Sequence, residues 1–112
     1  MMVEVGHNKV IRMSYGDKFS LDVEINDFTP VSSNTYWLSV KKVNTVLLDL
    51  QATSVVALED GVSLHFEANT ATMKQLPVND YVYDIYVRNA DGDIITIMFT
   101  AAFNVEKVAH NA

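Results

Sequence analysis

The 112 residues, 49% of them hydrophobic and 20% charged, fit a single globular domain that buries its own core. Cysteine is absent, which excludes a disulfide framework and thiolate-based metal or redox chemistry. Eight basic residues against fourteen acidic ones give a net charge of −6, and such a field opposes binding to nucleic acid or to an anionic membrane.

The chain contains no apolar run of membrane-spanning length and no apolar N-terminal segment behind a basic flank. Neither a transmembrane segment nor a signal peptide is therefore expected. Glycine is scarce and there are only two prolines, so no segment has the composition of a flexible linker between domains. We expect one β-sandwich domain over residues 1–112, with flexible termini at 1–8 and 107–112.

Alternation of apolar and polar residues, which is typical of half-buried strands, dominates the first part of the chain. Residues 9–14 are predicted to form a first strand at a sheet edge. After the turn Gly16-Asp17, the run Phe19–Ile25 alternates cleanly, and a further strand is predicted over Thr35–Lys41. Shorter strands are predicted over 46–50, 54–58 and 62–68.

Residues 69–75 are the one segment with helical character. Asn69 or Thr70 is suited to cap a short helix, and Pro77 ends it within two turns.

A strand over Tyr81–Arg88 follows, then an Asp91-Gly92 hairpin signal and a last long strand over Ile94–Val105. The small residues Ala101-Ala102 are predicted to mark a bulge or bend in that strand.

Short strands with turns every eight to twelve residues are typical of two-sheet architectures. The fold class predicted here is all-β: an immunoglobulin-like antiparallel β-sandwich of about seven to nine strands with one short helical turn. Immunoglobulin-like sandwiches often have a corner tyrosine near the start of a late strand. Here either Tyr81 or Tyr83, shortly after the Leu76-Pro77 corner, fits that role.

No residue pattern points to catalysis, a cofactor or a metal ion. The histidines His7, His65 and His110 lack metal-ligand spacing, and His65 is expected on the solvated face of its strand. Residues 89–93 carry carboxylates but lack the spacing of a calcium loop, so a structural turn is favoured. Without a Gly-x-Ser-x-Gly elbow, no nucleophile is indicated, and we predict that the protein is not an enzyme.

Exposed aromatic residues are the remaining candidates for function. Trp37 and Tyr86 are predicted on the polar faces of their strands, and Met98 on the second face of the apolar run Ile94–Phe99. These three residues form a possible interaction surface. Contact with protein, stacking against a glycan and half-exposed packing without a partner are all compatible with the pattern.

The strand and turn segments of the chain also resemble a family of immunoglobulin-like structural proteins of tailed bacteriophages and prophages. This family includes the N-terminal domain of baseplate upper proteins and related tail-associated proteins. The segments that carry the resemblance are Gly16–Val23, Trp37–Lys42, Val46–Leu50, Asp60–Leu64, Thr72–Pro77, Tyr81–Ile85 and Asp91–Asp93.

The resemblance implies a non-enzymatic structural or assembly protein of a virion, made in the host cytoplasm and placed in a tail, baseplate or neck. Its partners would be other virion proteins or further copies of itself, and no cofactor or catalytic residue is carried over. The alternative is a carbohydrate- or receptor-binding module that uses the exposed aromatic residues. A small hydrolase using His65 is a third hypothesis, because sandwiches host unrelated sites.

Overall fold

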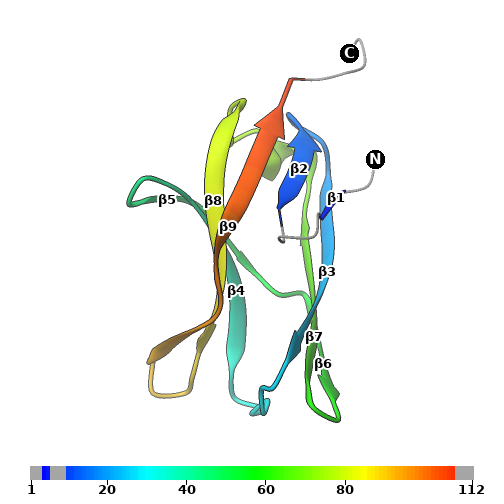
Figure 1. Ribbon diagram of the computed structural model, residues 1–112, viewed down its shortest axis with the longest axis vertical. Helices are drawn as coiled ribbons and strands as arrows, with labels where there is room; N and C mark the ends of the chain where they lie inside the picture. The colour runs from blue at the N-terminus through cyan, green and yellow to red at the C-terminus, as the bar shows by residue number, and fades with distance from the viewer. Residues whose placement is uncertain (1–3, 6–9, 108–112) are drawn as a thin grey trace.

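The computed structural model describes residues 4–5 and 10–107, which form two packed β-sheets (Figure 1). The larger sheet has six strands in the order β1-β2-β9-β8-β4-β5, and the smaller has the order β3-β7-β6. The elements are β1 (Glu4–Val5), β2 (Ile11–Ser14), β3 (Phe19–Asn26), β4 (Thr35–Lys42), β5 (Thr45–Gln51), β6 (Ser54–Leu58), β7 (Gly61–Ala68), α1 (Thr70–Met73), β8 (Asn79–Arg88) and β9 (Ile94–Glu106).

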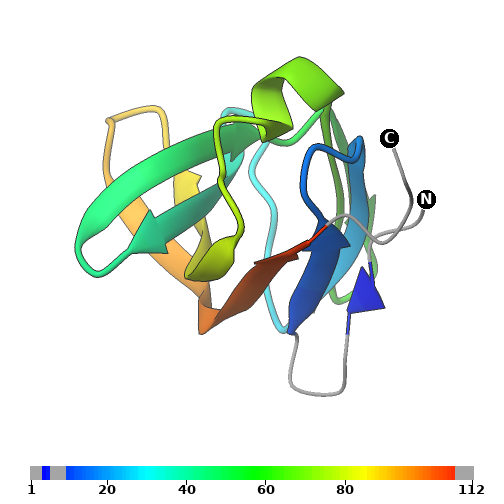
Figure 2. The same ribbon diagram turned by 90° about the horizontal axis from the view of Figure 1, so that it is seen from above.

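This arrangement confirms the predicted immunoglobulin-like sandwich, and Figure 2 shows its two layers from above. β9, β8 and β4 lie side by side as the central strands of the larger sheet, and β5 extends it beyond β4 as in variable-type immunoglobulin domains. β2 was predicted at a sheet edge, but that position is wrong. β1 pairs with its outer side, while β2 itself runs parallel to β9.

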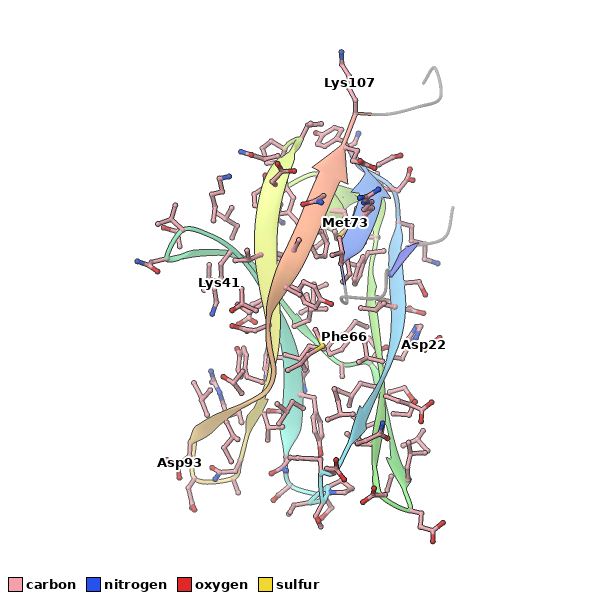
Figure 3. The ribbon with its side chains drawn as sticks, in the orientation of Figure 1. Asp22, Lys41, Phe66, Met73, Asp93 and Lys107 are labelled. Carbon is pink, nitrogen blue, oxygen red and sulfur yellow. The ribbon has the colours of Figure 1, made fainter. Side chains whose placement is uncertain are left out.

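The core lies between the sheets because alternate residues of each strand point inward. Phe19 and Phe66 come from the smaller sheet, and Phe103 comes from the larger one; all three are fully buried. The ring centres of Phe19 and Phe103 are 5.8 Å apart, and Tyr83 meets Phe103 edge-to-face at 6.0 Å. Figure 3 shows Phe66 between the two layers.

The short helix α1 forms where the sequence predicts it. The Asn69 side chain accepts a hydrogen bond from the Thr72 backbone N–H at 2.9 Å, which identifies Asn69 as the N-cap. Met73 is 1% exposed and packs into the core. The helix therefore helps to cover the end of the sandwich near the β7–β8 connection (Figure 2).

Two irregularities in the pairing of β8 with β9 correct the sequence-based description of the last strand. The register shifts between Tyr83 and Ile85 and again between Ile85 and Tyr86, which lengthens β9 relative to β8. The shift between Tyr83 and Ile85 places an extra residue between Met98 and Ala101, so the predicted bulge is present but lies just before Ala101-Ala102, which pair with Tyr83 and Val82. The shifts turn Met98 into the core, where it is 4% exposed, so Met98 does not belong to an exposed interaction surface.

The corner tyrosine is Tyr81. Its hydroxyl donates a hydrogen bond to the Pro77 carbonyl oxygen at 2.6 Å, which ties the start of β8 to the preceding corner. The Tyr81 side chain is 4% exposed and packs in the core. Its burial raises the pKa of the hydroxyl above the ordinary value.

Tyr81→Phe is expected to lower the free energy of unfolding by about 1 to 1.5 kcal/mol, because the Pro77 carbonyl loses its donor. Tyr36→Phe is the matched control: its hydroxyl is buried and has no hydrogen-bond partner among the described residues, so its removal should be neutral or stabilising. Urea unfolding of both variants checks this. Equal losses in the two variants would contradict the role assigned to Tyr81.

Candidate interaction face

The outer face of the larger sheet brings Trp37 and Tyr86 together. They are directly paired across β4 and β8. Both point outward because the strand neighbours of each face the core, and both are half-buried. Their rings are parallel within 9°, with centres 6.4 Å apart. The Arg88 guanidinium carbon lies 5.8 Å from the centre of the Trp37 ring. We call Trp37, Tyr86 and Arg88 the aromatic platform.

Both rings of the aromatic platform are held by hydrogen bonds. The Trp37 indole N–H donates to the Thr35 hydroxyl at 3.0 Å, and the Tyr86 hydroxyl donates to Asp49 Oδ2 at 2.8 Å. Burial, followed by the bond to Asp49, raises the pKa of Tyr86 to about 12. The phenol therefore stays neutral at physiological pH and keeps donating to Asp49.

A hollow of about 230 Å³ adjoins the aromatic platform. Lys41 Nζ and Asp84 Oδ2 form an ion pair there at 2.7 Å, and the Asp84 side chain is 12% exposed. Lys41 projects from the side of the larger sheet that faces away from the smaller one (Figure 3). The lining residues are Ser39, Lys41, Val46, Asp49, Asp84, Tyr86, Ile94 and Thr96. Small-molecule sites usually enclose about 300 to 1,000 Å³, so this hollow is better suited to one inserted side chain.

The outward orientation predicted for Trp37 and Tyr86 is confirmed. The sequence did not identify Asp49 and Arg88 as neighbours of these two residues. Arg88 could have been found, because it lies two residues after Tyr86 and therefore on the same face of the strand. Asp49 becomes a neighbour only through the pairing of β5 with β4, where it lies opposite Ser39.

His65 lies on the other side of the molecule, on the outer face of the smaller sheet. Its Nδ1 is 2.6 Å from Asp22 Oδ1, and its Nε2 is 2.8 Å from Glu67 Oε1. The predicted polar face is confirmed, but the ring is clamped between two carboxylates and its side chain is only 25% exposed. Both ring nitrogens are occupied, which leaves neither free to activate a nucleophile in this arrangement.

Within residues 4–5 and 10–107, no group of three or more His, Asp and Glu side chains is placed to hold a metal ion. His7 and His110 lie outside the described residues. In the 89–93 turn, the Asn89 side-chain oxygen accepts hydrogen bonds from the backbone N–H groups of Asp91 and Asp93 at 3.0 and 2.9 Å. These hydrogen bonds between the Asn89 side chain and the backbone hold the turn in its conformation. The described part of the chain has no helix long and apolar enough to cross a membrane.

The stability of the protein should depend on pH through His65. Hydrogen bonds to Glu67 and then to Asp22 raise the pKa of His65 above its ordinary 6.5. Because the folded pKa is the higher one, protonation stabilises the fold below about pH 6.5, and this contribution is lost as the pH rises through the folded pKa. The effect should be small, up to about 1 kcal/mol, because exposed ion pairs are screened by water.

His65→Gln keeps a polar side chain that cannot be protonated. The melting temperature of the wild type should exceed that of His65→Gln near pH 5.5, and the difference should shrink by about pH 8.5. High salt should reduce the difference at the lower pH. A difference that grows with rising pH would contradict the predicted direction.

Comparison of the chain with family models, with curated proteins and with solved structures returned no match. Function is therefore inferred from the geometry of the two sheet faces and from the sequence segments described above.

Proposed function

We propose that the protein is a non-enzymatic assembly module that acts through protein–protein contacts on the aromatic platform. The observation that carries this proposal is the half-exposed Trp37–Tyr86 pair with Arg88 beside it on the outer face of the larger sheet. Trp, Tyr and Arg are the residues most enriched at the energetic centres of protein interfaces, because they bury much area and keep a polar end.

The arrangement of the aromatic platform supports the same proposal. Trp37 and Tyr86 are already fixed by Thr35 and Asp49, so a partner would lose little side-chain entropy in contacting them. The adjoining hollow contains the Lys41–Asp84 ion pair, in which Asp84 Oδ1 is buried without a hydrogen-bond partner among the described residues, and it offers room for one partner side chain. This geometry favours recognition by a surface over capture of a small molecule.

The site of assembly that we propose is the virion of a tailed bacteriophage, in its tail, baseplate or neck. The support for this location is the resemblance of the strand and turn segments, such as Trp37–Lys42 and Tyr81–Ile85, to proteins of those structures. The partners would be other virion proteins and further copies of the chain.

A carbohydrate- or receptor-binding module is the second candidate, because sugars stack on aromatic rings and Asp49 lies beside Tyr86. Trp37 is the sole tryptophan, so its fluorescence reports on this face directly. Titration with a panel of hexoses and cell-surface oligosaccharides should leave the emission unchanged. A saturable change that disappears in Asp49→Ala would overturn the protein-contact proposal and support the glycan alternative.

A further inference from the structure

Two carboxylates line the hollow beside the aromatic platform, and they flank a small residue. Ser39 of β4 lies directly opposite Asp49 of β5 on one side and Asp84 of β8 on the other, so the three residues form one row across the outer face of the larger sheet. Neighbouring strands are about 4.8 Å apart, which separates the backbones of the two aspartates by roughly 10 Å. The short Ser39 side chain leaves open space between their carboxylates.

The chain itself does not satisfy these carboxylates fully. Asp84 as a whole residue is 9% exposed, and its Oδ1 is buried without a hydrogen-bond partner within the described part of the chain, while Oδ2 pairs with Lys41. Asp49 is exposed and accepts a hydrogen bond from the neutral Tyr86 hydroxyl, which does not compensate its charge. A buried acceptor without a donor is costly, and such atoms in native proteins usually bind water or a ligand.

The charge of the hollow selects the kind of group that can enter it. Asp49, Asp84 and Lys41 together give the lining one net negative charge, and the net charge of −6 on the whole chain acts in the same direction. An acidic side chain would be repelled. An apolar side chain would seal Asp84 Oδ1 and Asp49 away from water without offering them a donor. A cationic donor satisfies both carboxylates and neutralises the hollow.

We propose that the hollow binds the guanidinium group of an arginine side chain from the partner protein. This inference rests on the proposed function and names the chemistry of the partner at that same face. A guanidinium is planar and carries five N–H donors on different edges, so one group can donate to Asp49 and to Asp84 Oδ1 together. A lysine ammonium is a compact point charge, which is less suited to two carboxylates on opposite sides of Ser39. The volume of about 230 Å³ fits one such side chain.

Lys41 competes with the incoming guanidinium for Asp84. Its ammonium group holds Oδ2 in the free protein, and its side chain is 33% exposed on a flexible four-carbon stem. Lys41 can therefore turn toward solvent when the guanidinium takes its place beside Asp84. Removal of the Lys41 charge should strengthen binding of a guanidinium, whereas removal of the Asp49 charge should weaken it.

Two small probes of nearly the same shape test this site in the purified wild-type protein. Nα-acetyl-arginine amide carries the guanidinium, and Nα-acetyl-citrulline amide replaces it with an uncharged urea group. The arginine probe should cause saturable NMR shifts of the amides of Ser39, Asp49 and Asp84, with Kd on the order of millimolar. The citrulline probe should bind about tenfold more weakly, because it lacks the charge-assisted hydrogen bonds. Equal binding of the two probes, or no saturable shift with arginine, would overturn the proposal.

Three variants test the direction of each effect. Asp49→Asn keeps an acceptor for Tyr86 and should weaken binding of the arginine probe about fivefold or more. Lys41→Met should strengthen it by a similar factor, because the competing cation is gone. Glu24→Gln loses the same charge as Asp49→Asn but lies exposed on the smaller sheet, so it should bind like the wild type. Weakening by Glu24→Gln as large as by Asp49→Asn would show that only the net charge attracts the probe, and would contradict the site.

The titration needs no partner, so its failure is distinguishable from failure of the proposed function. If the arginine probe does not bind while Trp37→Ala still impairs assembly in the producing cell, the guanidinium assignment is wrong and the protein-contact proposal stands. If the probe binds but Trp37→Ala assembles normally, the proposed function is contradicted, and with it the assignment of the arginine to a protein partner.

Discussion

Trp37→Ala is expected to reduce assembly about thirtyfold or more and to lower the free energy of unfolding by only about 1 kcal/mol. Truncation of a central aromatic residue at an interface usually costs about 2 kcal/mol or more, which corresponds to about thirtyfold in affinity. Its contribution to the fold is smaller, because Trp37 is half-buried on the outer face, where it contacts Thr35, Tyr86 and Arg88.

Competition between two chains measures this effect even when the partner is not identified. Differently tagged wild-type and Trp37→Ala chains are expressed together in the producing cell, and their ratio is read by mass spectrometry in the assembled and free fractions. Val78→Ala, half-exposed and outside the aromatic platform, should enter assemblies as well as the wild type. A Trp37→Ala chain that assembles normally but melts much earlier would show that Trp37 has a structural role only.

Gly61→Ala is expected to cost about 3 kcal/mol or more in the free energy of unfolding, more than any other substitution considered for this chain. Gly61 begins β7 and lies opposite Asn26 of β3. A Cβ atom at this position would overlap the Ile25 carbonyl oxygen, and backbone atoms of two paired strands have little freedom to move away. Urea unfolding measures this loss: the midpoint of Gly61→Ala should fall while the m-value stays unchanged.

Gly92→Ala is the control for Gly61→Ala, because its cost has a different cause. Gly92 has φ of +85° in the β8–β9 hairpin, and a Cβ there would have open space around it. Only the left-handed backbone conformation opposes alanine, at about 1 kcal/mol. If Gly61→Ala costs no more than Gly92→Ala, then β3 and β7 are not as closely packed at Gly61 as the structure has them.

The strands of the sandwich were predictable because one buried face imposes alternation on the sequence. Phe19–Ile25 shows this most clearly, since its odd-numbered residues lie toward the core and its even-numbered residues toward solvent. Asn69 similarly marks the start of the short helix through local chemistry, whereas the helix already ends at Met73, before Pro77.

Met98 shows where alternation fails. Along β9, Met98 lies between two register shifts in the β8–β9 pair: the first places it on the core face, and the second restores the original alternation from Ala101 onward. No single residue in the run 94–99 indicates these shifts. The place of β2 between β1 and β9 was equally hidden, because a parallel partner far away in the sequence leaves no local signal. The choice of Tyr81 over Tyr83 also required the structure, since both tyrosines lie on the buried face of β8.

The aromatic platform was predictable in part. The polar neighbours of Trp37 and Tyr86 indicate that both side chains point outward, but their contact depends on the register of β4 against β8, which alternation does not fix. The hydrogen bond from Tyr86 to Asp49 depends on two strand pairings, β8 with β4 and β4 with β5, so the sequence alone could not predict it.

Site-specific photo-crosslinking tests most directly whether the aromatic platform is a protein-contact surface. A benzophenone amino acid replaces Thr96, which is exposed and paired with Tyr86, or Ser20, which is exposed on the outer face of the smaller sheet. After irradiation in the producing cell, Thr96 should yield a discrete adduct with a virion protein or another copy of the chain, and Ser20 should not. A Thr96 variant that yields no protein adduct above the Ser20 level would contradict the proposed function.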